Sequence, residues 1–275
     1  MELKDRVAVV TGGASGIGRA LCRTFAQRGA AAVVVSDLDG PGAEAVADEL
    51  TDRGAKALAV RTDVADSEDV AALVAAATDA FGPVDIFCAN AGIIVAGGPE
   101  VSDQDWDRIW AVNVKSHIYA ARAVLPSMLE RGEGYLVHTA SAAGLLTQLG
   151  SAPYSVTKHA AVALAEWLSI TYGDRGIRVS CLCPQAVWTG MAGAPKGGDS
   201  DLPDALAATK GTATGDGIVR PEEVADLVIE AMADERFLIL PHPQVATYEQ
   251  RRAGDRERWL KGMRRSQAQI SGFGG

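Results

Sequence analysis

The sequence lacks any apolar run of the roughly 20 residues that a membrane-spanning helix needs. Internal repeats and low-complexity segments are absent too, and no linker divides the 275 residues into two domains. Four of the first six residues are charged, and they lead directly into an apolar run, so we expect no signal peptide. These absences favour one large domain in the cytoplasm.

Cysteine is scarce, and its four residues follow no metal-binding spacing. Cys22, Cys88, Cys181 and Cys183 lie in segments that are typical of buried helices or strands, which favours reduced thiols over a disulfide framework. Cys181 and Cys183 are two residues apart on one predicted strand, so they face the same side. No metal site is expected. The four histidines are expected to be structural: His117, His138, His159 and His242.

Positive charge is in deficit over most of the chain. The formal net charge of −9 consists of +4 in residues 249–265 and −13 elsewhere, which argues against a nucleic-acid surface. We therefore divide the chain into a main domain, residues 1–243, and a basic C-terminal extension, residues 244–275. In the extension Tyr248, Trp259 and Met263 recur at near-helical spacing, so we expect it to cover a surface of its own subunit or of a neighbouring copy.

Short apolar runs alternate with helical stretches along the chain. The runs are continuously apolar, which predicts strands buried on both faces. Right-handed crossovers then place helices on both sides of a parallel sheet. The prediction is an α/β fold, a Rossmann-type doubly wound parallel sheet of about seven strands in a single domain. The predicted strands are 7–11, 32–36, 57–61, 84–89, 135–139, 177–183 and 237–240, and the predicted helices are 17–28, 41–53, 67–80, 103–130, 152–173 and 221–233.

A glycine-rich turn directly follows the first predicted strand, with the spacing Gly-x3-Gly-x-Gly over residues 12–18. Glycines allow a sharp turn and a close approach to a pyrophosphate, which then lies at the positive end of the next helix. A P-loop is excluded because Arg19 and Ala20 follow the last glycine in place of lysine and serine or threonine. The turn residues expected to bind a dinucleotide are Gly12, Ser15, Gly16, Ile17 and Gly18.

Asp37 follows the second predicted strand, nineteen residues after Gly18. Its carboxylate can accept hydrogen bonds from the adenosine ribose hydroxyls and would repel a 2′-phosphate. No arginine or lysine stands at positions 36, 38 or 39, so the predicted cofactor is NAD rather than NADP. Further cofactor contacts are expected at the same edge of the sheet from Leu38, Asp63, Val64, Asn90, Ala91 and Gly92.

Tyr154 and Lys158 are four residues apart in the predicted helix 152–173, so they share one face of it. A lysine ammonium there favours the tyrosinate, which predicts a Tyr154 pKa lowered from about 10 toward neutrality. Taken alone, such a pair is more often a solvated surface pair. Ser141 follows the fifth predicted strand, and Asn113 interrupts a helix for which asparagine is a poor former.

In this order, these motifs resemble the short-chain dehydrogenase/reductase family, in its short single-domain branch, from about Leu3 to Leu240. The resemblance implies hydride transfer between a nicotinamide cofactor and an alcohol or ketone. It implies that Tyr154 moves the proton, Lys158 binds the nicotinamide ribose, Ser141 stabilises the substrate oxygen, and Asn113 holds a water that links Lys158 to solvent. It also implies a homo-oligomer, a tetramer or dimer, through the helices 103–130 and 152–173.

One segment departs from the family pattern. Where the family has Pro-Gly-x-Val-x-Thr, this chain has Gln185 in the glycine position, which puts the local backbone shape and the substrate entrance in doubt. The matching residues, expected to contact the cofactor, are Pro184, Val187 and Thr189. The irregular stretch 190–217 that follows is typical of a binding loop or lid.

The candidate substrate pocket is mostly apolar, which favours an apolar secondary alcohol or ketone. Its expected residues are Ser141, Ala143, Leu149, Trp188 and Met191, with Ile93, Ile94, Val95, Leu145 and Leu146 beside them. Two other functions stay open. An NADPH-dependent acyl-thioester ketoreductase would need a basic residue near position 37, and a non-catalytic nucleotide-binding sensor would not need a tuned tyrosine.

Overall fold

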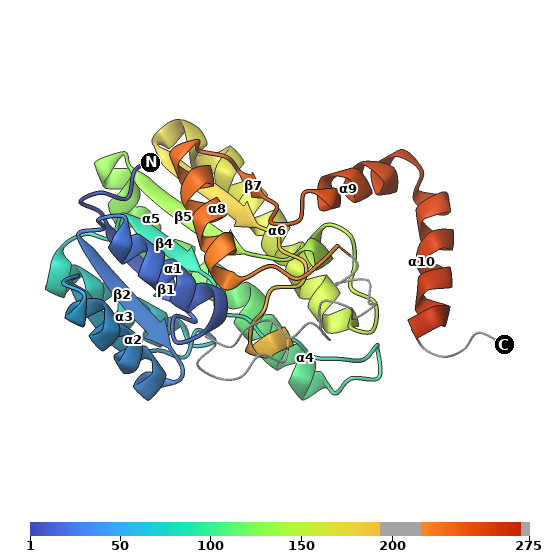
Figure 1. The fold of residues 1–275 in the computed structure, drawn as a ribbon, viewed down its shortest axis with the longest axis horizontal. Coiled ribbons are helices and arrows are strands. Elements are labelled where there is room, and N and C mark those ends of the chain that lie inside the picture. Colours follow the sequence, from blue (N-terminus) through green and yellow to red (C-terminus); the bar gives the residue numbers. More distant parts are fainter. Residues whose placement is uncertain (193–215, 271–275) are drawn as a thin grey trace.

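The computed structural model describes residues 1–192 and 216–270, without the side chains of residues 192, 269 and 270. At its centre lies a seven-stranded parallel sheet in the order β3-β2-β1-β4-β5-β6-β7, drawn in Figure 1. The chain starts in the middle of the sheet and builds outward in one direction and then in the other. The predicted doubly wound sheet is confirmed. Its strands are β1 (Val7–Thr11), β2 (Ala32–Asp37), β3 (Ala57–Arg61), β4 (Ile86–Ala89), β5 (Gly134–Thr139), β6 (Ile177–Leu182) and β7 (Leu238–Ile239).

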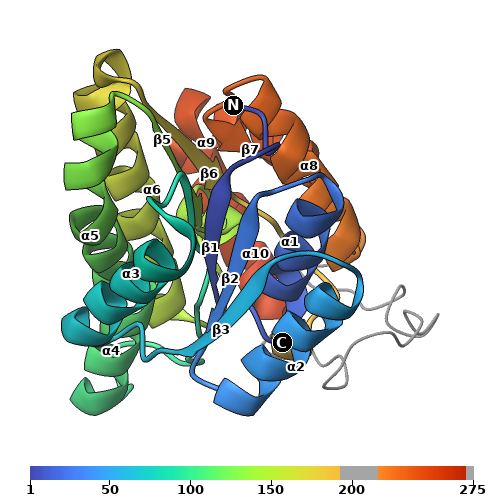
Figure 2. The ribbon, with the colours of Figure 1, turned by 90° about the vertical axis from the view of Figure 1, so that its left-hand side faces the viewer.

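Helices cover both faces of the sheet, as Figure 2 shows in the view along its edge. Two apolar clusters fill the two layers, and the continuously apolar central strands contribute to both because helices pack on each side of them. Strand β3 is different, because it lies at the edge and its residues are only partly buried. The expectation that every strand is buried on both faces is wrong there. One layer holds α1 (Gly16–Gln27), α2 (Gly40–Asp52) and α8 (Pro221–Ala233), and the other holds α3 (Ser67–Phe81), α5 (Ser116–Arg131) and α6 (Ala152–Tyr172).

The predicted helix 103–130 is three elements rather than one. Helix α4 (Asp103–Trp110) passes into a π-helical turn at Ala111–Lys115, and α5 follows. Asn113 lies in this turn. A π-helical turn inside a helical stretch often marks a functional site. The sequence contained a sign of it, since asparagine is unfavourable in a regular helix interior.

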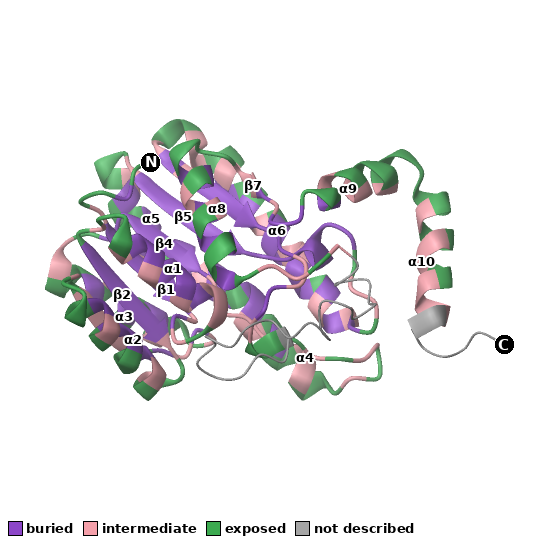
Figure 3. Ribbon diagram, viewed as in Figure 1, coloured by how far each residue is buried: buried purple, intermediate pink, exposed green. Residues whose placement is uncertain are grey.

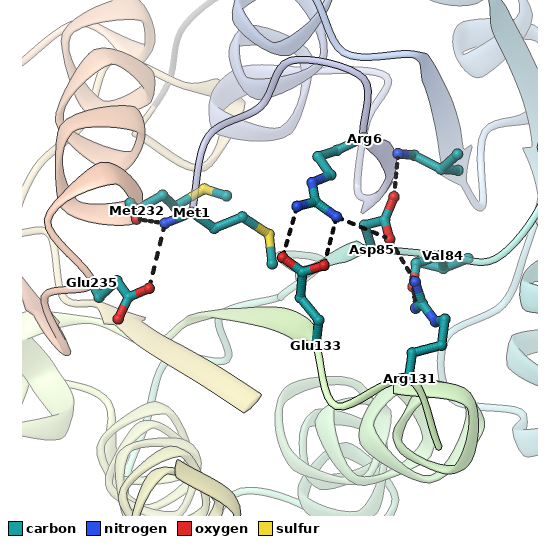
Figure 4. Close-up of polar contacts among 9 residues, drawn as sticks. Met1, Arg6, Val84, Asp85, Arg131, Glu133, Met232 and Glu235 are labelled. Atoms are coloured by element: carbon teal, nitrogen blue, oxygen red, sulfur yellow. Dashed lines mark hydrogen bonds and ion pairs between the residues drawn. The ribbon is translucent and has the colours of Figure 1, made fainter. Parts of the chain in front are cut away.

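The edge of the sheet at which its strands begin is closed by paired charges, shown in Figure 4. The Asp85 carboxylate accepts from the Val7 amide at 3.0 Å and pairs with Arg131 at 2.6 Å. Arg6 makes two hydrogen bonds to Glu133, at 2.8 and 2.7 Å. The charged side chains at this edge form ion pairs with one another. We therefore look for a ligand site at the opposite edge, where the strands end.

Two helices follow the sheet, α9 (Gln244–Gly254) and α10 (Arg256–Ile270). Figure 1 shows α9 to the right of β7 and α10 running downward at the right-hand side of the molecule. Val245 anchors α9 in the core with no exposed surface, whereas Figure 3 shows α10 as exposed or intermediate over the part whose burial is described, residues 256–268. The extension is therefore helical and held mainly through α9.

The remaining expectations concern cysteines, metals and membranes. All four cysteines are free and buried, and the Sγ atoms of Cys181 and Cys183 lie 3.7 Å apart on one side of β6. Within residues 1–192 and 216–270, no group of histidine, cysteine and acidic side chains could hold a metal ion. The same residues contain no helix that is long and apolar enough to cross a bilayer. Most of the predicted lid, residues 193–215, lies outside the described residues.

Candidate active site

The glycine-rich turn depends on glycine at three positions. Gly12 and Gly16 have φ of +67° and +52°, a region that other residues rarely adopt. A Cβ atom on Gly18 would lie 2.0 Å from the carbonyl oxygen of Gly12, so no larger residue fits. Ser15 is the N-cap of α1 but its side chain caps no amide. The turn thus leaves the positive end of α1 available to an anion such as a pyrophosphate.

Asp37 ends β2 beside this turn. One of its carboxylate oxygens accepts from the Ala14 amide at 3.0 Å and the other accepts from the Asp39 amide at 3.0 Å. The carboxylate is therefore fixed in place by backbone groups without a neutralising cation among these contacts. Two arginines of α1, Arg19 and Arg23, pair with Glu49 of α2 at 3.1 and 2.9 Å.

Asn90 fastens together the ends of three strands. Its amide group donates to the Thr11 carbonyl at 3.0 Å, and its side-chain oxygen accepts from the Thr139 hydroxyl at 3.1 Å. The Thr11 hydroxyl accepts in turn from the backbone amides of Asn90 and Ala91 at 3.0 and 3.2 Å. Thr11 and Thr139 were not among the predicted site residues, because threonine at a strand end is common and its partners depend on the order of the strands.

Asn113 is fully buried beneath the site. Its side chain makes two hydrogen bonds to the backbone of Ile93, both at 2.9 Å, and donates to the Thr157 hydroxyl at 3.2 Å. It therefore fastens the chain after β4 to helix α6, close to Lys158. The bound water that the family resemblance implies stays a prediction.

Lys158 and Tyr154 lie on one face of α6, as their spacing predicts. The Lys158 ammonium donates to the Thr139 carbonyl at 2.9 Å and lies 5.6 Å from the centre of the Tyr154 ring. Burial lowers the pKa of Lys158 to about 8. Ser141 follows β5 on the same side, where its Oγ accepts from the Ala143 amide at 3.1 Å.

The expected lowering of the Tyr154 pKa is wrong for this structure. Burial raises the pKa of Tyr154 above its ordinary value of 10, and a hydrogen bond with Ser141 only partly offsets this effect. Lys158 does not touch the hydroxyl, because its ammonium lies over the ring and is directed to Thr139. Sequence spacing placed both residues on one face but could not show where each polar end lies.

A cavity of about 1350 Å³ brings the predicted residues together at the edge where the strands end. Four predicted residues besides Leu149 are outside its lining, namely Gly18, Val95, Asn113 and Leu145. Gly18 packs within the glycine-rich turn, and Asn113 is fully buried. Leu149 is a correction, since it lines a separate smaller pocket. The chain turns at Thr147, with φ of +111°, so that Leu146 faces the main cavity and Leu149 does not. The predicted residues that line the main cavity are Gly12, Ser15, Gly16, Ile17, Asp37, Leu38, Asp63, Val64, Asn90, Ala91, Gly92, Ile93, Ile94, Ser141, Ala143, Leu146, Tyr154, Lys158, Pro184, Val187, Trp188, Thr189 and Met191.

Comparison with known proteins agrees with this geometry. A family model described as short chain dehydrogenase matches residues 6–197. The chain belongs to this family. A 1-deoxy-11-beta-hydroxypentalenate dehydrogenase of Streptomyces exfoliatus is 42% identical over 243 residues, which cover 87% of this chain and 84% of that protein. A cis-4-hydroxycyclohexanecarboxylate dehydrogenase of Sinomonas cyclohexanicum is 38% identical over 239 residues, 86% of this chain and 92% of that protein.

A solved structure gives the same result for the fold. A short-chain dehydrogenase/reductase from Burkholderia phymatum, in complex with NAD, is 35% identical and superimposes with a TM-score of 0.82. The similarity covers 94% of this chain and 96% of that one. This short-chain dehydrogenase is therefore an oxidoreductase built on a single parallel sheet.

The unusual Gln185 of this dehydrogenase does not distort the backbone. Among the described residues, only Asp5, Thr147 and Glu235 have a positive φ without being glycine. The Gln185 side chain donates to the Asp216 carboxylate at 3.0 Å, and its backbone amide donates to His242 Nδ1 at 3.3 Å. The departure from the family pattern thus joins the end of β6 to the chain around residues 216 and 242.

The dehydrogenase cavity also contains residues that sequence reasoning missed. The periodicity of the extension predicted helices but not which surface they face, because that depends on the connection through residues 240–243. Arg108 was not singled out at all, since an exposed arginine in an amphipathic helix is ordinary. The additional residues of interest in the lining are Arg108, Asp216, Tyr248, Arg251, Trp259 and Met263.

Two histidines of the dehydrogenase are buried next to each other, His117 on α5 and His138 on β5. The Nδ1 atoms of His117 and His138 are 2.9 Å apart, and neither side chain has exposed surface. Burial lowers the pKa of His138 to about 4 and holds the pKa of His117 well below its usual range, with His138 and Lys158 adding to the effect on His117. Both rings are neutral at pH 7, which agrees with the expected structural role.

Proposed function

We propose that this short-chain dehydrogenase transfers a hydride between NAD and a secondary alcohol or its ketone, with Tyr154 as the general acid and base. The observation that carries the proposal is one continuous cavity. Ser141, Tyr154 and Lys158 line it together with the glycine-rich turn and Asp37. The cavity can hold a dinucleotide and a small alcohol next to each other. A nucleotide sensor would not require room for the second ligand.

The residues fit NAD. The glycine-rich turn and the start of α1 would hold its pyrophosphate, Asp37 would accept from its adenosine ribose, and Lys158 would reach its nicotinamide ribose. Asp37 also opposes a 2′-phosphate, and two arginines of the cavity lining, Arg19 and Arg23, are paired with Glu49. The bound nicotinamide supplies the hydride acceptor or donor. The NAD complex of the related Burkholderia phymatum structure supports this assignment.

Tyr154 carries the proton at its hydroxyl oxygen. Because burial raises its pKa, the neutral phenol predominates at pH 7 and is ready to donate during ketone reduction. Oxidation needs the tyrosinate, so we expect the rate of alcohol oxidation to rise with pH above 7 while ketone reduction does not. Lys158, with a pKa of about 8, is about nine-tenths protonated at pH 7 and stabilises negative charge near Tyr154.

Ser141 is placed to bind the substrate oxygen. Its Oγ accepts from the Ala143 amide and donates to the Pro184 carbonyl at 3.3 Å, a long bond that a substrate oxygen can replace. A donor fixed in this way stabilises the developing negative charge on the reacting oxygen. Asn113, through Ile93 and Thr157, keeps helix α6 and therefore Tyr154 in register with this serine.

The substrate class follows from the pocket and from the relatives. Leu146, Trp188, Met191 and Trp259 contribute apolar surface to the lining of the cavity. Two relatives are named for hydroxylated carboxylates, 1-deoxy-11-beta-hydroxypentalenate and cis-4-hydroxycyclohexanecarboxylate. We therefore propose a secondary hydroxyl on an alicyclic, mainly apolar skeleton.

A panel of cyclic secondary alcohols with NAD tests the proposal, followed through the absorbance of NADH. We expect turnover of at least one cyclohexanol derivative and a slower reaction with open-chain alcohols of the same size. Binding of NADH without turnover of any alcohol or reduction of any ketone would favour the nucleotide-sensor alternative. Reduction of acyl thioesters with NADPH, in preference to the oxidation of alcohols and the reduction of simple ketones, would favour the ketoreductase alternative.

The homo-oligomer also stays a proposal. On the outer side of α6, Trp167 and Ile170 are 55% and 83% exposed. Ala121, Val124 and Leu168 are buried within the subunit, so their apolar side chains need no second copy. Trp167 and Ile170 have no such cover. Light scattering at micromolar concentration should give a multiple of the 28.6 kDa chain mass.

A further inference from the structure

We infer that Arg251, on the C-terminal extension, binds a carboxylate of the substrate at the end of the cavity remote from the reacting hydroxyl. The inference rests on the proposed function, because it assumes that the substrate lies in the same cavity as Tyr154. It assigns to the extension a role in substrate recognition within its own subunit.

Helix α9 is fixed against the site by a chain of hydrogen bonds. The Tyr248 hydroxyl donates to one oxygen of Asp216 at 2.9 Å, and the Gln185 side chain donates to the other at 3.0 Å. At the start of the helix Val245 is fully buried. Helix α9 is thus tied to residue 185, directly after the strand that leads to Trp188. A side chain on this helix has a defined position relative to the cavity.

Arg251 lies three residues after Tyr248, on the same face of α9, and both line the cavity. The charge of Arg251 acts on Tyr248: the Asp216 hydrogen bond is the main cause of the raised Tyr248 pKa, and Arg251 lowers that pKa in part. The guanidinium is therefore near the phenol and faces the cavity side of the helix.

Arg251 has no counterion within the part of the chain that the structure describes. The two oxygens of Asp216 are already used by Tyr248 and Gln185. The neighbouring Arg252 is directed elsewhere, with Nη2 3.5 Å from His159 Nε2. The other acidic residues of the lining are Asp37, Asp63 and Glu222, and none forms an ion pair with Arg251.

An unpaired guanidinium at the border of an apolar cavity suits a planar anion. Trp188, Trp259 and Met263 line the same cavity, and the ring centroids of Trp259 and Tyr248 lie 6.5 Å apart. A guanidinium presents two parallel N–H donors that match the two oxygens of a carboxylate. The ligand that satisfies both features has an apolar skeleton with a carboxylate on one side and the secondary alcohol on the other.

Binding of matched acids and amides tests the inference without turnover. The probes are cyclohexanecarboxylate and adamantane-1-carboxylate, each paired with its carboxamide, titrated calorimetrically into the NADH complex of the full chain. For at least one pair we expect the acid to bind the wild-type protein about tenfold more tightly than the amide. Arg251→Gln should abolish that preference and leave amide binding unchanged.

Two further variants serve as controls. Arg258→Gln removes the same charge from an exposed position on α10 that does not line the cavity, and it should keep the preference. Arg251→Lys should retain part of it, because the charge stays but the two-donor geometry is lost. Equal binding of acid and amide by the wild-type protein in both pairs, or equal losses in Arg251→Gln and Arg258→Gln, would overturn the inference. The proposed function would fail in a different way: the acids would bind, but no alcohol would be turned over.

Discussion

The two ends of the cavity are built in different ways. At the cofactor end, backbone atoms fix the shape: Gly18 leaves no room for a Cβ atom, and the Asp37 carboxylate is held by two backbone amides. At the substrate end, side chains from distant segments meet, with Trp188 after β6 and Tyr248 and Trp259 on the extension. The cofactor end therefore tolerates little change, whereas the substrate end can change its ligand without altering the sheet.

The difference has a consequence for function. The residues that we propose to hold the dinucleotide are coupled to folding, because the same turn joins β1 to α1. Residues such as Arg251 are held through one helix and a few hydrogen bonds, so their substitution should affect substrate binding alone. Variants at the two ends should give opposite patterns of damage.

The largest expected effect is at the centre of the cavity, where the two ends meet. Tyr154→Phe should lower turnover about a thousandfold or more, since general acid–base catalysis contributes roughly 10² to 10⁴. The NADH dissociation constant should hardly change. Steady-state kinetics and fluorescence titration with NADH measure the two quantities. Tyr119→Phe is the matched control, because Tyr119 is outside the cavity lining. Near-normal turnover in Tyr154→Phe would rule out the proposed proton transfer.

The second effect concerns the contribution of the buried pair His117 and His138 to stability. The pKa of His138 is lowered from 6.5 to about 4 in the folded protein, so between these pH values the unfolded chain binds more protons. Stability should therefore fall as the pH falls from 6.5 to 4, by up to about 3 kcal/mol from this group. His117 should add to the loss in the same direction.

Urea unfolding at several pH values tests this expectation. A variant with His117→Asn and His138→Asn should lose less stability between pH 6.5 and 4.5 than the wild-type protein does. The single variant His138→Asn should give an intermediate slope. Identical slopes for all three proteins would show that the pair does not control acid stability, and that carboxylates do.

The third effect is the choice between NAD and NADP at the cofactor end of the cavity. We expect kcat/KM with NAD to exceed that with NADP by about a hundredfold. Each 1.4 kcal/mol of repulsion between Asp37 and the 2′-phosphate lowers the affinity for NADP about tenfold. Asp37→Ala should reduce this ratio by about tenfold or more. Asp39→Ala, which changes the neighbouring carboxylate outside the cavity lining, is the control and should preserve the ratio. Equal efficiency with both cofactors in the wild-type protein would contradict the role given to Asp37.

The contrast between the cofactor end and the substrate end also explains which features could be predicted from the sequence. The continuous apolar strands, the glycine spacing and the pair Tyr154 and Lys158 are local patterns, so the sheet and the cofactor end could be predicted. Edge strand β3 was mistaken for a buried one because apolar composition does not show which strand lies last.

The substrate end could not be predicted in the same way. Leu149 was misplaced because a turn at Thr147 decides which side chain faces the cavity. The Tyr154 pKa was misjudged because it depends on burial and on where the Lys158 ammonium is directed. Arg251 was visible only as part of a basic segment, since its place depends on the tertiary path of the chain after β7.

The most direct test of the contrast is a crossed measurement on two variants. One is a chain that ends at Gly254, which keeps α9 with Val245, Tyr248 and Arg251 but removes Trp259 and Met263 from the cavity. The other is Asp37→Ala. For each, NADH affinity is measured by fluorescence and the alcohol KM by steady-state kinetics. We predict that the shortened chain keeps its NADH affinity within about twofold while its alcohol KM rises about tenfold, and that Asp37→Ala does the reverse. If the shortened chain lost NADH affinity while its alcohol KM stayed unchanged, the division of the cavity into two ends would be wrong.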